Sequence, residues 1–154
     1  MRIFWIGLLT GMLCCSSWAA GKSSGKIFKV LPHFVDQKGR HSLSPSLYER
    51  DAYQALLKKT PELISTIRFD VQWNARSASK EPLKLRIELR GSKLKSRDPL
   101  IIEQAVQRKG IFSHWSALVL DKEKYRDLGE VVSWRATLWA GERQLAEQKS
   151  FLWQ

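Results

Sequence analysis

Strict alternation of apolar and polar side chains is the dominant pattern after Pro61. Residues 67–73 read Ile-Arg-Phe-Asp-Val-Gln-Trp, and residues 83–90 read Leu-Lys-Leu-Arg-Ile-Glu-Leu-Arg. A period of two places every second side chain on the same face of a strand. One face buried and the other solvated is typical of antiparallel sheets. The pattern therefore predicts two amphipathic strands.

Five more segments have shorter or less regular alternation. With the two above, the predicted strands cover residues 27–35, 64–75, 83–90, 100–107, 113–120, 131–140 and 144–153. Several short strands separated by polar turns are typical of two antiparallel sheets packed face to face. The predicted fold class is therefore mainly β, a seven-stranded antiparallel sandwich with one α-helix inserted between the first and second strands.

The inserted segment has helical spacing. Ser46 and Glu49 have the spacing of a capping box, and Pro61 ends the pattern, which predicts a helix over residues 47–59. An apolar stripe needs apolar surface to cover, so we expect this helix to pack on a face of one sheet. The expected stripe consists of Tyr48, Ala52, Ala55 and Leu56, widened by Tyr53 and Leu57.

A shorter helical segment precedes the sixth predicted strand. Asp121 suits its N-cap and Gly129 its end, and Tyr125 lies between them.

With seven strands in this order, Tyr125 resembles the tyrosine corner of immunoglobulin-like domains. The chain resembles an immunoglobulin or fibronectin type III sandwich of a small exported bacterial protein over most of residues 27–153. It departs from that pattern in lacking the inter-sheet cysteines, in carrying a core tryptophan on the second strand instead of the third, and in the inserted helix.

The N-terminal twenty residues have a different character. Arg2 precedes an apolar run, and small residues follow it, with Ser17 and Ala19 suited to the −3 and −1 positions of a cleavage site. This order is typical of a secretory signal. We therefore expect export to the periplasm or cell surface, although an uncleaved membrane anchor and a lipoprotein signal remain alternatives. The predicted organisation is a signal peptide over 1–19, a flexible leader over 20–26 and one immunoglobulin-like domain over 27–154.

Composition limits the chemistry of the domain. Both cysteines lie in the predicted signal, so we expect no disulfide, thiol nucleophile or cysteine-ligated metal in the domain. Lys and Arg number 26 against 15 Asp and Glu, a formal net charge of +11. Such an excess attracts anionic partners, here acidic polysaccharide or a membrane surface, and export argues against nucleic acid. The alternative is a dispersed solvated charge, because basic and acidic residues alternate.

Candidate catalytic and metal-binding residues are few. His33 and Asp36 are three positions apart and His41 follows a turn, so a three-ligand metal site is one hypothesis, against that of ordinary polar residues at strand ends. No serine-hydrolase or zinc-protease motif occurs, and we expect a non-catalytic protein without a cofactor. Asp70 and Glu88 could form the carboxylate pair of a hydrolase, but cross-strand pairing with arginine is the simpler interpretation.

The tryptophans are the best binding candidates. Trp73 and Trp134 are in phase with the apolar alternation and are expected in the core. Trp139 is out of phase with Trp134, so we expect it on the opposite face unless the inserted helix covers it. An exposed indole beside arginine can stack on a sugar or anchor a protein. The candidate binding residues are Trp139, Arg135, Arg143 and Trp153.

Three functional hypotheses follow from these observations. The first is an exported accessory module that contacts another envelope protein. The second is a module that binds carbohydrate or an anionic cell-wall polymer through exposed tryptophan and basic side chains. The third is a metal carrier that uses the two histidines and the aspartate named above.

Overall fold

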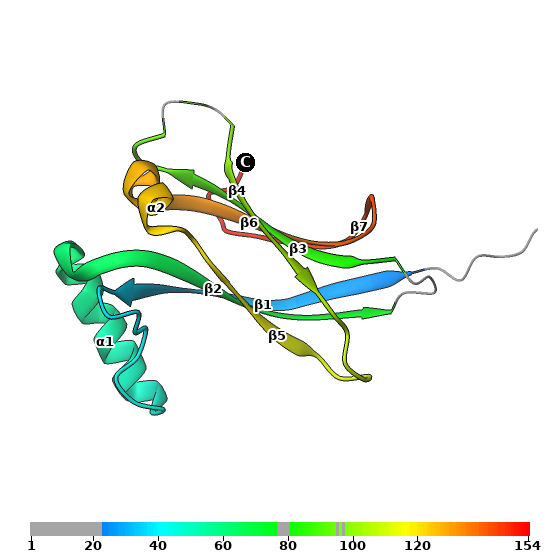
Figure 1. Cartoon of the computed structure of the whole chain (residues 1–154), viewed down its shortest axis with the longest axis horizontal. Coiled ribbons are helices and arrows are strands. Elements are labelled where there is room, and N and C mark those ends of the chain that lie inside the picture. The colour runs from blue at the N-terminus through cyan, green and yellow to red at the C-terminus, as the bar shows by residue number, and fades with distance from the viewer. Residues whose placement is uncertain (1–22, 77–80, 95, 97) are drawn as a thin grey trace, which may run out of the picture.

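Two antiparallel sheets stack to form the body of the protein (Figure 1). The computed structural model describes residues 23–76, 81–94, 96 and 98–154, so the signal peptide expected over 1–19 lies outside the described residues. The first sheet contains, in spatial order, β1 (Ser24–Asp36), β2 (Ile64–Arg76) and β5 (His114–Val119). The second contains β4 (Leu100–Val106), β3 (Leu83–Gly91), β6 (Val131–Ala140) and β7 (Arg143–Lys149). The predicted fold class is confirmed.

Strand positions also agree closely with the alternation, with differences at both ends of the chain. β1 begins at Ser24, which pairs with Arg76, so the last three residues of the leader expected over 20–26 belong to the sheet instead. β7 ends at Lys149, and the chain then turns, so the last strand is shorter than the predicted 144–153. This turn places Trp153 in a buried position outside the strand.

The core lies between the two sheets, where the in-phase apolar positions meet. Trp73 is buried on β2, as predicted, and its indole N–H donates to Ser116 Oγ at 2.9 Å. Trp134 lies edge-on to Phe69 across the two sheets, with ring centroids 6.5 Å apart. The largest fully buried side chains include Trp73, Phe69, Leu85, Ile87, Leu89 and Leu138.

The inserted helix α1 (Leu47–Lys59) has its predicted bounds, with Ser46 as N-cap. Tyr53 and Leu57, the two residues that widen its expected stripe, are its buried residues. The expected stripe, Tyr48, Ala52, Ala55 and Leu56, is exposed. α1 contacts β1 and the short 3₁₀ turn η1 (Pro61–Leu63) that leads into β2. The helix therefore projects from one end of the sandwich and does not cover a sheet face (Figure 1).

A second helix, α2 (Lys122–Leu128), precedes β6 at the same end of the sandwich (Figure 1). Asp121 caps it through bonds from the backbone N–H groups of Glu123 and Lys124, as the sequence predicts. Gly129 ends it at a φ of 74°, which favours glycine. Tyr125 is half-buried against the core.

Each lateral side of the sandwich is formed by one edge strand from each sheet. β1 contacts β7 along one side, where a Cβ on Gly25 would lie 2.8 Å from Leu145 Cβ. On the other side β4 and β5 lie next to each other, and all four of these strands are the last hydrogen-bonded strands of their sheets. Among the described residues no strand pairs with the outer side of β5.

Candidate functional site

The outer face of the second sheet carries the predicted tryptophan and arginine candidates. Trp139 on β6 is half-buried, and its indole N–H donates to Thr137 Oγ1 at 2.8 Å. The Arg86 guanidinium lies over its ring, 5.2 Å from the centroid, and is held by Glu103. Trp139 does emerge opposite to Trp134, and arginine covers it instead of α1.

Trp153 lies on the same face and is only 7% exposed. The guanidinium of Arg90 is 4.5 Å from its ring centroid, and that of Arg135 is 5.2 Å away. Arg135 is also bonded to Glu88, and Arg90 donates to the Gln154 carbonyl at 2.9 Å. The structure thus brings Arg135 and Trp153 together, but Arg135 pairs with Glu88 and the Trp153 ring is covered by two guanidinium groups.

Arg143 does not belong to this contact group. It is exposed at the start of β7, opposite Ala140 in the register. Asp70 and Glu88 are also apart, because β2 and β3 belong to different sheets and are not neighbouring strands. Asp70 pairs with Arg68 at 2.8 Å, and Glu88 pairs with Arg135. Ion pairing with arginine therefore accounts for both carboxylates.

The three residues of the metal hypothesis do not converge. His33 Nε2 lies 3.6 Å from Asp70 Oδ2, and the His33 and His41 ring centroids are 5.7 Å apart. Asp36 faces a different set of groups, the side chains of Arg40 and Tyr53. Within the described part of the chain, no three His, Cys, Asp or Glu side chains are grouped to hold a metal ion.

Burial and hydrogen bonding shift the acidity of two of these residues. Burial lowers the pKa of His33, against the opposing attraction of Asp70. Burial alone would raise the pKa of Asp36, but bonds from the Arg40 and Lys38 backbones and the Tyr53 and Arg40 side chains hold it well below its usual range.

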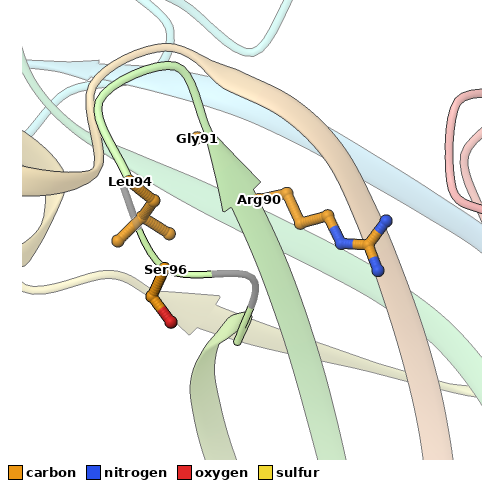
Figure 2. A pocket seen from close by; sticks show the side chains of 4 residues that line it. All are labelled: Arg90, Gly91, Leu94 and Ser96. Atoms are coloured by element: carbon orange, nitrogen blue, oxygen red, sulfur yellow. The ribbon is translucent and has the colours of Figure 1, made fainter.

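A cavity of about 360 Å³ opens where β3 leads into its following loop (Figure 2). It is lined by Arg90, Gly91, Leu94 and Ser96. Figure 2 shows the Arg90 side chain directed away from Leu94 and Ser96. That guanidinium already contacts the Trp153 ring and donates to the Gln154 carbonyl, so it is not available to a ligand in the cavity.

A group of exposed apolar side chains lies along β5 and the loop before it. Ile111 and Phe112 are 78% and 77% exposed, and Trp115 and Val119 are 53% and 54% exposed. We call these four residues the edge patch. Single exposed apolar residues are common, but two of these four lie on one edge strand and two in the loop next to it, which makes this edge a candidate interaction site.

The phase of β5 explains the edge patch. Leu118 and Leu120 are buried, so the alternation places Trp115 and Val119 on the opposite, outer face. The candidate set from the sequence did not include these residues. The alternation within 115–120 contains the signal, but it does not show that this strand ends a sheet.

Basic residues flank the edge patch along the chain. Arg108 and Lys109 come before it, and Lys122 and Lys124 follow it in α2. All four are exposed. The Arg108 guanidinium also donates to the Ala75 carbonyl at 3.2 Å, which attaches the loop to the end of β2. Asp121 and Glu123 offset the two lysines after the patch, so Arg108 and Lys109 before it are the charges that favour an acidic partner.

Comparisons with protein-family models, with curated proteins and with solved structures gave no match to this chain. No helix among the described residues has the length and apolar character needed to cross a membrane.

Proposed function

We propose that the protein is an exported, non-catalytic module that binds an extended acidic segment of another envelope protein along β5. The observation that carries this proposal is the coincidence of the edge patch with an unpaired edge strand. An extended segment that adds to a sheet edge gains main-chain hydrogen bonds from the edge and specificity from alternate side chains.

The hydrogen bonds of Leu120 support this mode of binding. Its N–H donates to the Ile67 carbonyl at 3.0 Å, and its carbonyl accepts from Thr66 Oγ1 at 2.6 Å, so its polar groups face β2. Successive residues of an antiparallel strand direct these groups to opposite sides. The N–H groups of Ala117 and Val119 therefore point toward the open side, where a partner strand would pair.

The domain type and the location are part of the same proposal. The strand orders β1-β2-β5 and β4-β3-β6-β7 support an immunoglobulin or fibronectin type III arrangement. Arg2 and the apolar run after it support export. A partner in the same compartment would be another envelope protein, and its acidic residues would pair with Arg108 and Lys109 before the edge patch.

A peptide-display selection against the purified protein tests the proposal. We expect it to enrich acidic peptides with alternating apolar positions, and their binding to perturb the backbone amides of β5 in NMR spectra. Ala117→Pro removes one outward N–H at an edge position that tolerates proline. We expect this change to abolish binding, while Ala117→Val, which keeps the N–H, retains it.

The side-chain contribution is tested separately. Phe112→Ser with Trp115→Ser is expected to weaken peptide binding at least tenfold. Tyr48→Ser with Phe151→Ser removes two exposed aromatic side chains elsewhere and is the matched control. Equal binding by Ala117→Pro and the unmodified protein, or binding only of acidic polysaccharide, would contradict the proposal.

A further inference from the structure

A second cavity, of about 320 Å³, lies at the end of the sandwich that carries both helices. Segments far apart in sequence form it: the end of α1, the start of β2, the loop after β3, and α2 with the residues that follow it. Its volume is at the small end of the range of ligand pockets. We call it the basic cavity, because of the side chains described next.

Three cationic side chains line the basic cavity: Lys58, Lys93 and Arg126. All three are exposed, and neither lysine has an ion-pair partner among the described residues. Arg126 lies 3.9 Å from Asp127, but both side chains are about three-quarters exposed, so this pair is weak. Glu130 is the acidic residue of the lining, which leaves an excess of positive charge.

The remaining lining is largely apolar and partly aromatic. Phe34 and Tyr125 are half-buried and pack against the core, and Pro61 and Ile64 add aliphatic surface. Burial raises the pKa of the Tyr125 hydroxyl, so it remains a neutral donor at pH 7. An apolar lining with a few convergent polar groups is typical of small-molecule sites.

We propose that the basic cavity binds a small organic anion with a flat apolar body. The apolar part would lie against Phe34 and Tyr125, and the anionic group would lie among the ammonium and guanidinium groups of Lys58, Lys93 and Arg126. Glu130 opposes this charge, so it limits affinity and disfavours ligands of high negative charge. The site is separate from β5 and does not depend on the function proposed above.

The probe that we choose is 8-anilino-1-naphthalenesulfonate, a flat aromatic anion that fluoresces when it leaves water. N-phenyl-1-naphthylamine has the same rings without the sulfonate and is the neutral comparison. We expect saturable one-to-one binding of the sulfonate that weakens as salt is added, and at least tenfold weaker binding of the neutral amine. Fluorescence titration and calorimetry measure both.

Variants that change the charge of the lining in opposite directions test whether the probe binds in this cavity. Lys93→Gln with Arg126→Gln should weaken sulfonate binding about tenfold or more, because two attractive charges are lost. Glu130→Gln removes a repulsive charge and should tighten binding about threefold. Lys29→Gln with Lys149→Gln changes the net charge of the protein equally at exposed sites outside the lining and should leave binding within about twofold.

Three outcomes would overturn the inference. The first is equal weakening by the cavity pair and the control pair, which would indicate general charge attraction. The second is unchanged or weaker binding by Glu130→Gln. The third is loss of probe binding on Phe112→Ser with Trp115→Ser, which would place the probe on the edge patch. Ala117→Pro should leave sulfonate binding unchanged, so failure of this inference and failure of the proposed function are distinguishable.

Discussion

The Tyr53 hydroxyl donates a 2.7 Å hydrogen bond to Oδ2 of Asp36 and so joins α1 to the end of β1. The other carboxylate oxygen accepts from the backbone N–H groups of Lys38 and Arg40, each at 2.8 Å. One buried carboxylate therefore determines both the turn after β1 and the position of the helix. A buried acceptor with this many donors is costly to replace.

Replacing Asp36 with Asn tests this role. At pH 7 we expect the melting temperature of Asp36→Asn to fall by about 5–10 °C, since an amide cannot accept from all of these donors. The folded protein holds the pKa of Asp36 below its usual range, so its stabilising effect is complete above about pH 4 and is lost as the pH falls through the folded value. The difference between the two proteins should therefore shrink below pH 4 in thermal melts. A constant difference down to pH 2 would contradict this role.

His33 predicts a separate pH effect. Burial lowers its pKa, so the folded protein favours the neutral ring and the unfolded chain takes up a proton first. The free energy of unfolding should therefore decrease as the pH falls below about 6.5. His33→Gln removes the titrating group and should flatten this slope between pH 7 and 5 in urea titrations. His114→Gln is the matched control, and an unchanged slope in His33→Gln would show that other groups cause it.

The contact between β3 and α2 predicts a steric effect. A Cβ added to Gly91 would lie 2.1 Å from the Leu128 carbonyl oxygen, so either the strand end or the helix end has to move. We expect Gly91→Ala to lower the free energy of unfolding by about 2–3 kcal/mol. Gly110→Ala is the control, because no atom lies within 4 Å of its Cβ and only its φ of 79° is unfavourable, at about 1 kcal/mol. Equal effects of the two changes in urea titrations would contradict the steric explanation.

Local patterns predicted most of the fold. Alternation located all seven strands, and the Ser46 cap with Pro61 gave the bounds of α1, because both signals act over a few residues. The prediction that α1 covers a sheet face was wrong, since only Tyr53 and Leu57 of its apolar stripe are buried. The helix is instead held by polar bonds, from Tyr53 to Asp36 and between the Gln54 side chain and the Phe34 backbone.

The sequence predicted less of the candidate sites than of the fold. Arg135 and Trp153 were both among the candidate binding residues, but no pattern paired them, because their stacking depends on the turn after Lys149. The basic cavity brings together residues as distant in sequence as Lys58, Lys93 and Arg126. No period or spacing links such residues, since only the arrangement of the two sheets brings their loops to one end.

The C-terminal residues provide the last prediction. Trp153 is 7% exposed beneath two guanidinium groups, whereas Phe151, two positions earlier, is 98% exposed. Removing a buried indole loses both its apolar burial and its cation–π contacts, so Trp153→Ala should lower the free energy of unfolding by about 3 kcal/mol in urea titrations. Phe151→Ala should change it by less than about 0.5 kcal/mol. Arg90 and Arg135 share the Trp153 ring as a partner, and the alanine variant removes it. Trp153→Phe keeps an aromatic ring for both guanidinium groups, so it should retain part of the lost stability. If Trp153→Ala proved as stable as Phe151→Ala, the C-terminal residues would contribute nothing to the second sheet, and the indole would be free for a ligand.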